Sequence, residues 1–240
     1  MTKIIILTSK VSEESAKVLS TLMNADIDFP YDSKNRDYTG YDYVFKYGFS
    51  RLIKAKKGTT FNRTGPTEIA KNKILTFEAL KDKDITVEYT QDINCAHKWI
   101  QDGHTVVSRD TADGSNGAGI KYCTTRKEVD SVKALFWTKC IYEKQELRVN
   151  LWRNKVLSIY VKTVNEGVFD FSLVKGNENH PQLVNIAQTV YDKVGLDFCG
   201  LDLLTDDTGR LYLLEVNSAP ILFPYTAKKL VAEINKETKK

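Results

Sequence analysis

The pattern of apolar and polar positions predicts that the chain begins with a strand followed by a helix. Residues 4–7 form a short apolar run rich in isoleucine, which is typical of a buried strand. Residues 12–15 offer a polar helix start, and apolar residues then recur at helical spacing at Ala16, Leu19, Leu22 and Met23. Residues 41–49 alternate in part and indicate another strand. This order indicates a small α/β layer at the start of the chain.

A second set of elements follows residues 54–65, whose composition is typical of a loop or linker. Pro66 opens a helix whose apolar stripe is Ile69, Ile74, Phe77 and Leu80. The next elements predicted are strands at residues 85–89, 105–108 and 119–123 and a helix at residues 128–137. The last part of the chain predicts strands at residues 147–152 and 156–162 and helices at residues 183–194 and 226–237.

The strongest hairpin signal in the chain lies at residues 198–217, where two strands flank the turn Asp206-Asp207-Thr208-Gly209. If the turn is centred on its two middle residues, Asp202 lies opposite Leu213 and diagonal to Glu215. Side chains on a strand alternate between faces with period two. Asp202, Glu215 and Asn217 are therefore expected on one face, near the open end of the hairpin.

Two carboxylates and a carboxamide on one face form an all-oxygen site, which suits Mg²⁺ that bridges nucleotide phosphates. The alternative is a half-exposed hairpin with solvated acids. Glu215 argues against that alternative because it follows the apolar run 211–214, beside which an unpaired carboxylate is costly.

A glycine-rich loop at residues 113–119 lies between two predicted strands. Glycine lets the backbone approach a ligand closely, and successive N–H groups can then bind phosphate. The alternative is a plain turn, since the loop matches neither a Walker A motif nor G-x-G-x-x-G. The cations placed around it are Lys73, Arg109, Arg148 and Lys162. Taken singly, each is more often a surface charge, although Arg148 lies within an apolar strand, where an arginine usually has an anionic partner.

Composition bounds the remaining possibilities. The 240 residues suffice for one or two domains, and the net charge of +4 is too weak to indicate a nucleic-acid-binding protein. The four cysteines form no C-x-x-C pair and the three histidines lack ligand spacing, so the sequence signals neither a zinc site nor a disulfide framework. The first apolar run is too short for a signal peptide and no run reaches transmembrane length. We therefore expect a cytoplasmic protein.

These pieces follow the order of the ATP-grasp superfamily, and the chain resembles its carboxylate–amine ligase branch. That branch includes ribosomal-protein glutamate ligases, D-alanine–D-alanine ligases and compact phage-encoded ATP-grasp proteins. The resemblance covers residues 66–225 and rests mainly on Gly195-Leu196-Asp197-Phe198-Cys199-Gly200-Leu201-Asp202 and Leu214-Glu215-Val216-Asn217-Ser218-Ala219-Pro220. It implies an α/β (α+β) ATP-grasp fold in which two α+β subdomains, residues 66–137 and 138–240, grip the nucleotide. A short N-terminal α/β region, residues 1–65, precedes them.

The resemblance also implies roles for individual residues. Lys73 and Arg109 would meet the nucleotide phosphates, and Glu146 would hold the ribose. The expected phosphate loop contains Gly114, Ser115, Asn116, Gly117 and Gly119, and the expected adenine hinge is Lys139-Cys140-Ile141. Asp202, Glu215 and Asn217 match the magnesium ligands. Arg148 matches an arginine near the γ-phosphate and the acyl group, and Lys162 is expected beside it as a second catalytic cation.

Three positions depart from the family pattern. Arg109 stands where a lysine is usual, Lys139 where the hinge often has an acid, and Ile221 where a glycine usually follows the proline. The first two bear on the phosphate and adenine contacts, and the third bears on the shape of the acceptor pocket.

The implied function is an ATP-dependent ligase that activates a small carboxylic acid as an acylphosphate and joins it to an amine. ATP and one or two Mg²⁺ ions, or Mn²⁺, are the expected cofactors, and the host cytoplasm is the expected location if the chain is phage-encoded. Two alternatives stay open. One is a ligase that modifies a macromolecule, either a protein terminus or a modified nucleic acid, and the other is a nucleotide-binding regulator that has lost the chemistry. The sequence leaves the acid, the amine and the oligomeric state open.

Overall fold

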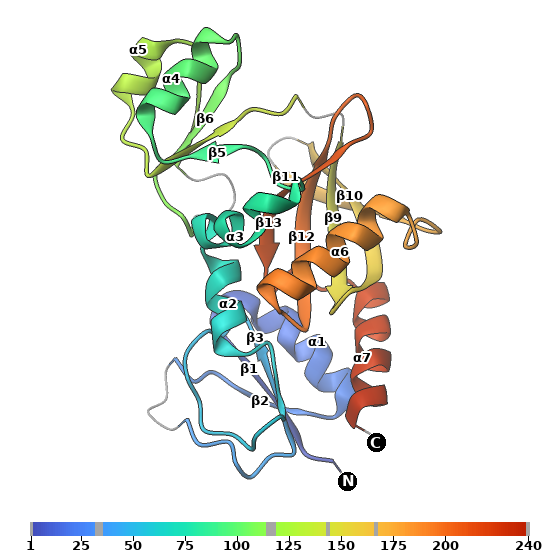
Figure 1. The fold of residues 1–240 in the computed structure, drawn as a ribbon. Coiled ribbons are helices and arrows are strands. Elements are labelled where there is room, and N and C mark those ends of the chain that lie inside the picture. Colours follow the sequence, from blue (N-terminus) through green and yellow to red (C-terminus); the bar gives the residue numbers. More distant parts are fainter. Residues whose placement is uncertain (1, 32–35, 114–118, 143–144, 166–167, 239–240) are drawn as a thin grey trace.

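The computed structural model describes residues 2–31, 36–113, 119–142, 145–165 and 168–238. These residues form three β-sheets that follow one another along an elongated molecule, with helices packed on each sheet (Figure 1). The two ends of the chain lie close together at one end of the molecule (Figure 1). Among the described residues, no helix is both long and apolar enough to span a membrane.

The N-terminal sheet contains parallel strands in the order β2-β1-β3-β4. Its strands are β1 (Ile4–Thr8), β2 (Asp26–Asp28), β3 (Tyr43–Tyr47) and β4 (Thr60–Phe61). Helix α1 (Glu13–Met23) follows β1 after a short 3-10 turn, η1 (Lys10–Ser12), and ends at Asn24, which adopts the left-handed conformation. The predicted α/β start is therefore present, and it includes strand β4 within residues 54–65, which were predicted to be a loop.

The small sheet, at the top of Figure 1, is antiparallel in the order β5-β8-β6-β7. Its strands are β5 (Tyr89–Thr90), β6 (Val106–Arg109), β7 (Ile120–Cys123) and β8 (Phe136–Lys139). Helices α4 (Ile93–Gln101) and α5 (Arg126–Ser131) pack on it through a core that includes Trp99, Val129 and Trp137.

Two sequence predictions for this region are wrong. Helix α5 begins at a capping box made by Thr125 and Glu128 but stops at Ser131, so residues 136–137 belong to strand β8 instead of the predicted helix. Residues 85–87 form no regular strand of the small sheet, because Thr86 forms an isolated bridge with Leu213 of the large sheet. Helix α4 was not predicted.

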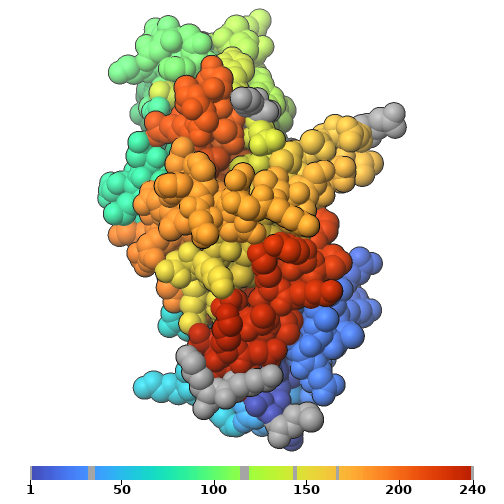
Figure 2. All heavy atoms as spheres, turned by 90° about the vertical axis from the view of Figure 1, so that its right-hand side faces the viewer, coloured from blue at the N-terminus to red at the C-terminus, as the bar shows by residue number. Residues whose placement is uncertain are grey.

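The large sheet is antiparallel in the order β11-β10-β9-β12-β13. Its strands are β9 (Gln145–Trp152), β10 (Lys155–Asn165), β11 (Val168–Val174), β12 (Phe198–Thr205) and β13 (Leu211–Asn217). The predicted strands and hairpin are present, and edge strand β11 was missed. Figure 2 shows the β10–β11 hairpin projecting from the body of the molecule.

Helix α6 (Pro181–Val194) covers one face of the large sheet and shares an apolar core with it. The helix predicted from Pro66 is two helices, α2 (Thr64–Lys71) and α3 (Lys73–Leu80). The break occurs at Asn72, whose extended backbone ends α2 and whose side chain accepts hydrogen bonds from Ile74 N and Leu75 N at 3.0 and 3.1 Å. Asn72 therefore caps α3 and fixes the direction in which its first residue, Lys73, points.

The N-terminal sheet packs on the far end of the large sheet. One apolar core combines Phe45 and Tyr47 of β3 with Phe198 of β12 and with α1 and helix α7 (Pro224–Thr238). Figure 2 shows α7, in red, between the blue N-terminal segment and the yellow strands of the large sheet. Buried Asn62 links the same parts, because its side chain bonds to both the N–H and the C=O of Phe198, at 2.8 Å each.

Candidate functional site

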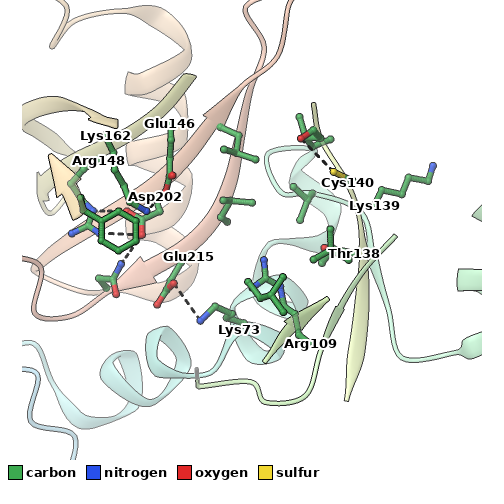
Figure 3. A pocket seen from close by; sticks show the side chains of 18 of the residues that line it. Lys73, Arg109, Thr138, Lys139, Cys140, Glu146, Arg148, Lys162, Asp202 and Glu215 are labelled. Atoms are coloured by element: carbon green, nitrogen blue, oxygen red, sulfur yellow. Dashed lines mark hydrogen bonds and ion pairs between the residues drawn. The ribbon is translucent and has the colours of Figure 1, made fainter. Parts of the chain in front are cut away.

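A cleft of about 430 Å³ lies between the large sheet and the small sheet. One wall is formed by side chains of β9, β10, β12 and β13, and the other by side chains of β6, β7 and β8 and the segment after β8 (Figure 3). The cleft brings together many of the residues predicted from the sequence. They are Lys73, Arg109, Lys139, Cys140, Ile141, Glu146, Arg148, Lys162, Asp202, Glu215 and Asn217.

The register of the β12–β13 hairpin differs from the prediction, yet it preserves the predicted face. Near the turn, Thr205 pairs with Leu211, one residue further than expected. A β-bulge after Asp202 shifts the register by one residue more, so Asp202 lies directly opposite Glu215. Because the two shifts add to an even number, Asp202, Glu215 and Asn217 still line the same cleft. The bulge also brings Leu214 into the cleft wall.

Arg148 and Asp202 are paired neighbours on β9 and β12 and form a two-pronged ion pair. The Arg148 Nε donates to Asp202 Oδ1, and Nη2 donates to Oδ2 at 3.1 Å. The side chains are only 11% and 12% exposed, so water screens this pair weakly. The fork-like geometry fixes the guanidinium at the centre of the cleft wall.

Lys162 and Glu146 form a second pair, since they lie opposite one another on β10 and β9. The Lys162 Nζ donates to Glu146 Oε1 at 2.5 Å. Both cations on this wall also lie over aromatic rings of β11: Arg148 Cζ is 5.7 Å from the ring centre of Phe171, and Lys162 Nζ is 4.4 Å from that of Phe169.

Lys73 reaches the cleft from the first position of α3 and is buried. Its Nζ lies 3.3 Å from Glu215 Oε2 (Figure 3). Burial raises the pKa of the Glu215 carboxyl, and the nearby Lys73 ammonium partly lowers that pKa again. The three acids Glu146, Asp202 and Glu215 thus each have a cation partner.

Arg109 ends β6 on the opposite wall and is largely removed from water. Burial lowers the pKa of its guanidinium. Its Nε is buried and has no hydrogen-bond partner among the described residues. A buried donor without an acceptor is costly, so this position favours an anionic ligand.

The hinge residues differ in what their backbones can offer. The Lys139 N–H donates to Glu88 O and the Cys140 N–H to Thr105 O, both at 2.9 Å. The small sheet therefore uses these two amides itself. Among the described residues, the Ile141 N–H has no backbone acceptor, so it is the hinge amide best placed to meet a ligand. The Lys139 side chain points away from the opposite wall (Figure 3) and bonds to Glu88 at 2.7 Å.

Most of the predicted phosphate loop lies outside the described residues, namely Gly114, Ser115, Asn116 and Gly117. Gly119 is described and adopts a φ of +73°, which favours glycine. A Cβ there would lie 1.7 Å from Asp110 Oδ1, so the Asp110 side chain would have to move to make room for one. Gly119 does not line the cleft, although Ile120 does.

Sequence reasoning missed most of the apolar lining of the cleft. These side chains are Val87, Val107, Ile120, Tyr122, Leu204, Leu214, Phe169 and Phe171, whereas Ile221, which also lines the cleft, was expected to shape the acceptor pocket. A signal for two of them existed, because Phe169 and Phe171 alternate with Asp170 and Ser172 in a strand-like pattern. The others come from elements whose contribution to the cleft depends on how the two sheets pack.

The donor set fits a magnesium ion held together with phosphates. Among the described residues, no group of three or more His, Cys, Asp or Glu side chains could hold a metal alone. Asp202, Glu215 and Asn217 supply two carboxylates and one amide, which leaves coordination positions for phosphate oxygens and water. Mg²⁺ is usually bound in this way, through one or two carboxylates and the phosphates of a substrate.

Comparison with known proteins connects this geometry to a family. The model of the RimK-like ATP-grasp domain matches residues 70–238. No curated protein matches the chain by sequence.

Several solved structures share the fold along the whole chain. The ATP-grasp ligase PsnB, complexed with a phosphomimetic variant of its minimal precursor, Mg and ADP, has a TM-score of 0.69 at 12% identity, with 98% of this chain and 99% of that chain covered. D-alanyl-alanine synthetase A from Vibrio cholerae O1 biovar eltor has a TM-score of 0.72 at 14% identity, with 100% and 99% covered. A Chryseobacterium gregarium RiPP-associated ATP-grasp ligase, in complex with ADP and a leader and core peptide, has a TM-score of 0.69 at 13% identity, with 99% and 97% covered. These likenesses confirm the predicted ATP-grasp fold, a mixed α/β fold with three sheets.

Proposed function

The chain belongs to the RimK-like ATP-grasp family, and on this basis we propose that it is a Mg- and ATP-dependent ligase that activates a carboxylic acid and joins it to an amine. One observation carries the proposal. The Arg148–Asp202 pair and the Glu215–Lys73 pair lie side by side on one wall of the cleft, with Asn217 beside them. This is a metal donor set placed next to the cations that a phosphoryl transfer needs.

The nucleotide is proposed to lie along the cleft between the two sheets. The adenine would occupy the apolar side of the small sheet and bond to the Ile141 backbone, and Glu146 would hold the ribose. Lys73 and Arg109 would contact the phosphates. The Nε of Arg109 has no hydrogen-bond partner in the part of the chain that the structure describes, which supports an anion at that position. The apolar side chains of Val87, Val107 and Leu214, which line the cleft, suit the flat faces of a base.

The metal is proposed to be held by Asp202, Glu215 and Asn217. When bound, Mg²⁺ would neutralise charge on the transferring phosphoryl group. For Asp202 to serve as a ligand, its carboxylate must share oxygen atoms with Arg148 or release it. Arg148 would then be available to the γ-phosphate and to the acid, with Lys162 next to it.

The chemistry proceeds in two displacements. A carboxylate oxygen of the acid attacks the γ-phosphorus of ATP, a new O–P bond forms, and the bond to ADP breaks. The amine nitrogen then attacks the acyl carbon, the C–N bond forms, phosphate leaves and the nitrogen loses a proton. The work of the protein is positioning and charge neutralisation, so no nucleophilic side chain is required.

A second candidate is the same chemistry on a macromolecular acceptor. The structural relatives that hold peptides favour this candidate, since PsnB and the Chryseobacterium gregarium ligase were solved with precursor or leader peptides. Mass spectrometry of candidate peptides after incubation with Mg-ATP would reveal the mass change of a new amide.

The direct test of the proposed function is the release of ADP from Mg-ATP when acids and amines are supplied together. We expect ADP and phosphate, with no AMP, and we expect release to require the acid. Mg-ATP that binds without turnover in every combination would favour a regulator that has lost the chemistry. Failure of Mg-ATP to bind in calorimetry would contradict the proposal altogether.

A further inference from the structure

The segment after β13 is held at three points around one end of the cleft. Buried Tyr47 donates its hydroxyl hydrogen to Pro220 O, and Leu222 N donates to Ser15 Oγ at 3.1 Å. The Phe223 ring then packs against Phe171, with 5.4 Å between ring centres. These anchors fix the path of the segment on both sides of Ile221.

The same segment lies directly against Arg148. A Cβ built on Gly200 would lie 2.6 Å from Pro220 Cβ and 3.2 Å from Arg148 Cδ. Only glycine therefore lets Pro220 and Arg148 approach each other across β12. Ile221, the next residue, is consequently held at the Arg148 end of the cleft.

Ile221 exposes its side chain at this position. It lines the cleft and is 56% exposed, although its neighbours Pro220 and Leu222 are buried. Phe169, 41% exposed, and Phe171 line the same cleft from strand β11. Exposed apolar side chains that gather in a cleft beside polar groups are typical of a ligand-binding site.

The charged groups of this wall are already matched. Asp202 is paired with Arg148 and Glu146 with Lys162. At this end of the cleft a charged side chain on the substrate would therefore meet Ile221 and the two phenylalanines. Arg109, which the described residues leave without an ion pair, lies on the opposite wall. An apolar side chain on the substrate would bury its surface there, while the carboxylate of the acid lies at Arg148.

We propose that Ile221, Phe169 and Phe171 form a subsite for an apolar side chain, so that the acid this chain activates carries a branched aliphatic or aromatic group. The inference rests on the proposed function and adds the substrate class. Ile221 is the residue with the greatest expected influence, because it is the most exposed of the three and is held at the Arg148 end of the cleft.

The test uses hydroxylamine in place of the unidentified amine. With Mg-ATP, an activated acid forms an acylphosphate, the hydroxylamine nitrogen displaces phosphate, and a coloured iron complex reports the hydroxamate. The acids compared are 4-methylpentanoate and phenylacetate against glutarate and succinate. We expect kcat/KM to be on the order of 10- to 100-fold higher for the apolar acids, the discrimination that a hydrophobic pocket can supply.

Two variant pairs assign the effect to the subsite. Ile221→Ala and Phe169→Ala should each lower kcat/KM for the apolar acids by about 10-fold more than they lower kcat/KM for glutarate. Val168→Ala, next to Phe169 and 68% exposed, and Val184→Ala on α6, 44% exposed, do not line the cleft and should change nothing. Equal rates with polar and apolar acids, or equal effects in both pairs, would overturn the subsite and leave the ligase proposal standing.

A binding measurement separates the subsite from the chemistry. Ligand-observed NMR with phenylacetate in the presence of Mg-ADP should show binding to the unchanged chain and weaker binding to Ile221→Ala. If phenylacetate binds, Ile221→Ala weakens its binding and no hydroxamate forms, the result would contradict the proposed ligase activity and support the subsite. Absence of both binding and hydroxamate for the apolar acids would overturn the subsite.

Discussion

The two walls of the cleft are built on different physical principles. The large-sheet wall carries charged side chains held in pairs, among them Arg148 with Asp202 and Lys162 with Glu146. The small-sheet wall is mostly apolar and has backbone groups at Cys140 and Ile141. The first wall suits chemistry that depends on charge, and the second suits the binding of a flat base by shape.

The difference indicates how the proposed work is divided. The charged side chains of the large-sheet wall have fixed relative positions, because these two ion pairs each join residues that are register partners on neighbouring strands. The small-sheet wall offers few side chains whose identity is chemically required. Substitutions on the first wall should therefore affect turnover, and perturbations of the second should affect nucleotide binding alone.

The largest effect is expected for Asp202→Asn. The change keeps the shape of the side chain but removes one of the proposed metal-binding carboxylates and the counter-charge of Arg148. Turnover, measured as acid-dependent ADP release across a Mg²⁺ titration, should fall on the order of 100-fold or more. Asp207→Asn in the exposed turn of the same hairpin is the matched control and should have no effect. Full activity in Asp202→Asn would contradict a role of the large-sheet wall in the reaction.

The next largest effect is expected for Lys73→Met. It removes a buried cation that would contact phosphate, so Mg-ATP affinity in calorimetry should fall about 10- to 100-fold. Lys71→Met removes an exposed cation two residues earlier on α2 and should leave the affinity unchanged. Equal losses of Mg-ATP affinity in the two variants would contradict a direct phosphate contact by Lys73 and would indicate an effect of net charge alone.

The apolar wall can be tested through its cysteine. Cys140 lines the cleft, whereas Cys95 lies on α4 away from it. Saturating Mg-ADP should slow alkylation of Cys140 by about 10-fold or more and leave Cys95 unaffected, because a bound base covers the hinge. Peptide mass mapping reads both sites at once. Burial raises the pKa of Cys199 to about 12, so that thiol should stay unmodified at neutral pH. An alkylation rate of Cys140 that Mg-ADP does not change would indicate that the nucleotide binds elsewhere.

The smallest effect is expected in the pH dependence of magnesium binding. Since burial raises the pKa of Glu215, its carboxyl is protonated at a higher pH than an exposed glutamate. Mg²⁺ affinity for the ADP complex should therefore weaken as the pH falls through that raised pKa. The same group favours the folded chain at low pH and loses this contribution as the pH rises through its folded pKa.

Lys73→Met sharpens the pH measurement, because the Lys73 ammonium lowers the pKa of Glu215. Without it, the loss of Mg²⁺ affinity should begin at a higher pH, while Lys71→Met should follow the unchanged chain. An unaltered pH profile in Lys73→Met would contradict the coupling of these two groups.

The sequence was most informative where side-chain chemistry and alternation coincide. The hairpin at residues 198–217 was predicted closely, as were the strands that carry Arg148 and Lys162. Even the register error left Asp202 and Glu215 on one face, because the two one-residue shifts add to a shift of two residues, which preserves the face. A period-two pattern therefore identified the face without identifying the pairs.

The sequence was least informative where a residue's role depends on packing between distant segments. Residues 136–137 fit a helical pattern locally, yet they belong to central strand β8, where Trp137 pairs with both β5 and β6 and Phe136 pairs with β6. Ile141 is the proposed hinge donor because Glu88 and Thr105 accept hydrogen bonds from the two preceding amides. No local pattern encodes these contacts, and the same holds for Ile221, whose exposure depends on anchors from α1, β3 and β11.

The transfer of oxygen from the acid to phosphate tests the central claim most directly. An acid labelled with ¹⁸O in its carboxylate, chosen for the fastest turnover, is incubated with Mg-ATP and hydroxylamine, and the products are analysed by mass spectrometry. Acylphosphate formation predicts one ¹⁸O in each inorganic phosphate released, with ADP as the nucleotide product. Label in AMP, unlabelled phosphate beside ADP, or no consumption of ATP with any acid would contradict ATP-dependent activation of a carboxylate in this cleft.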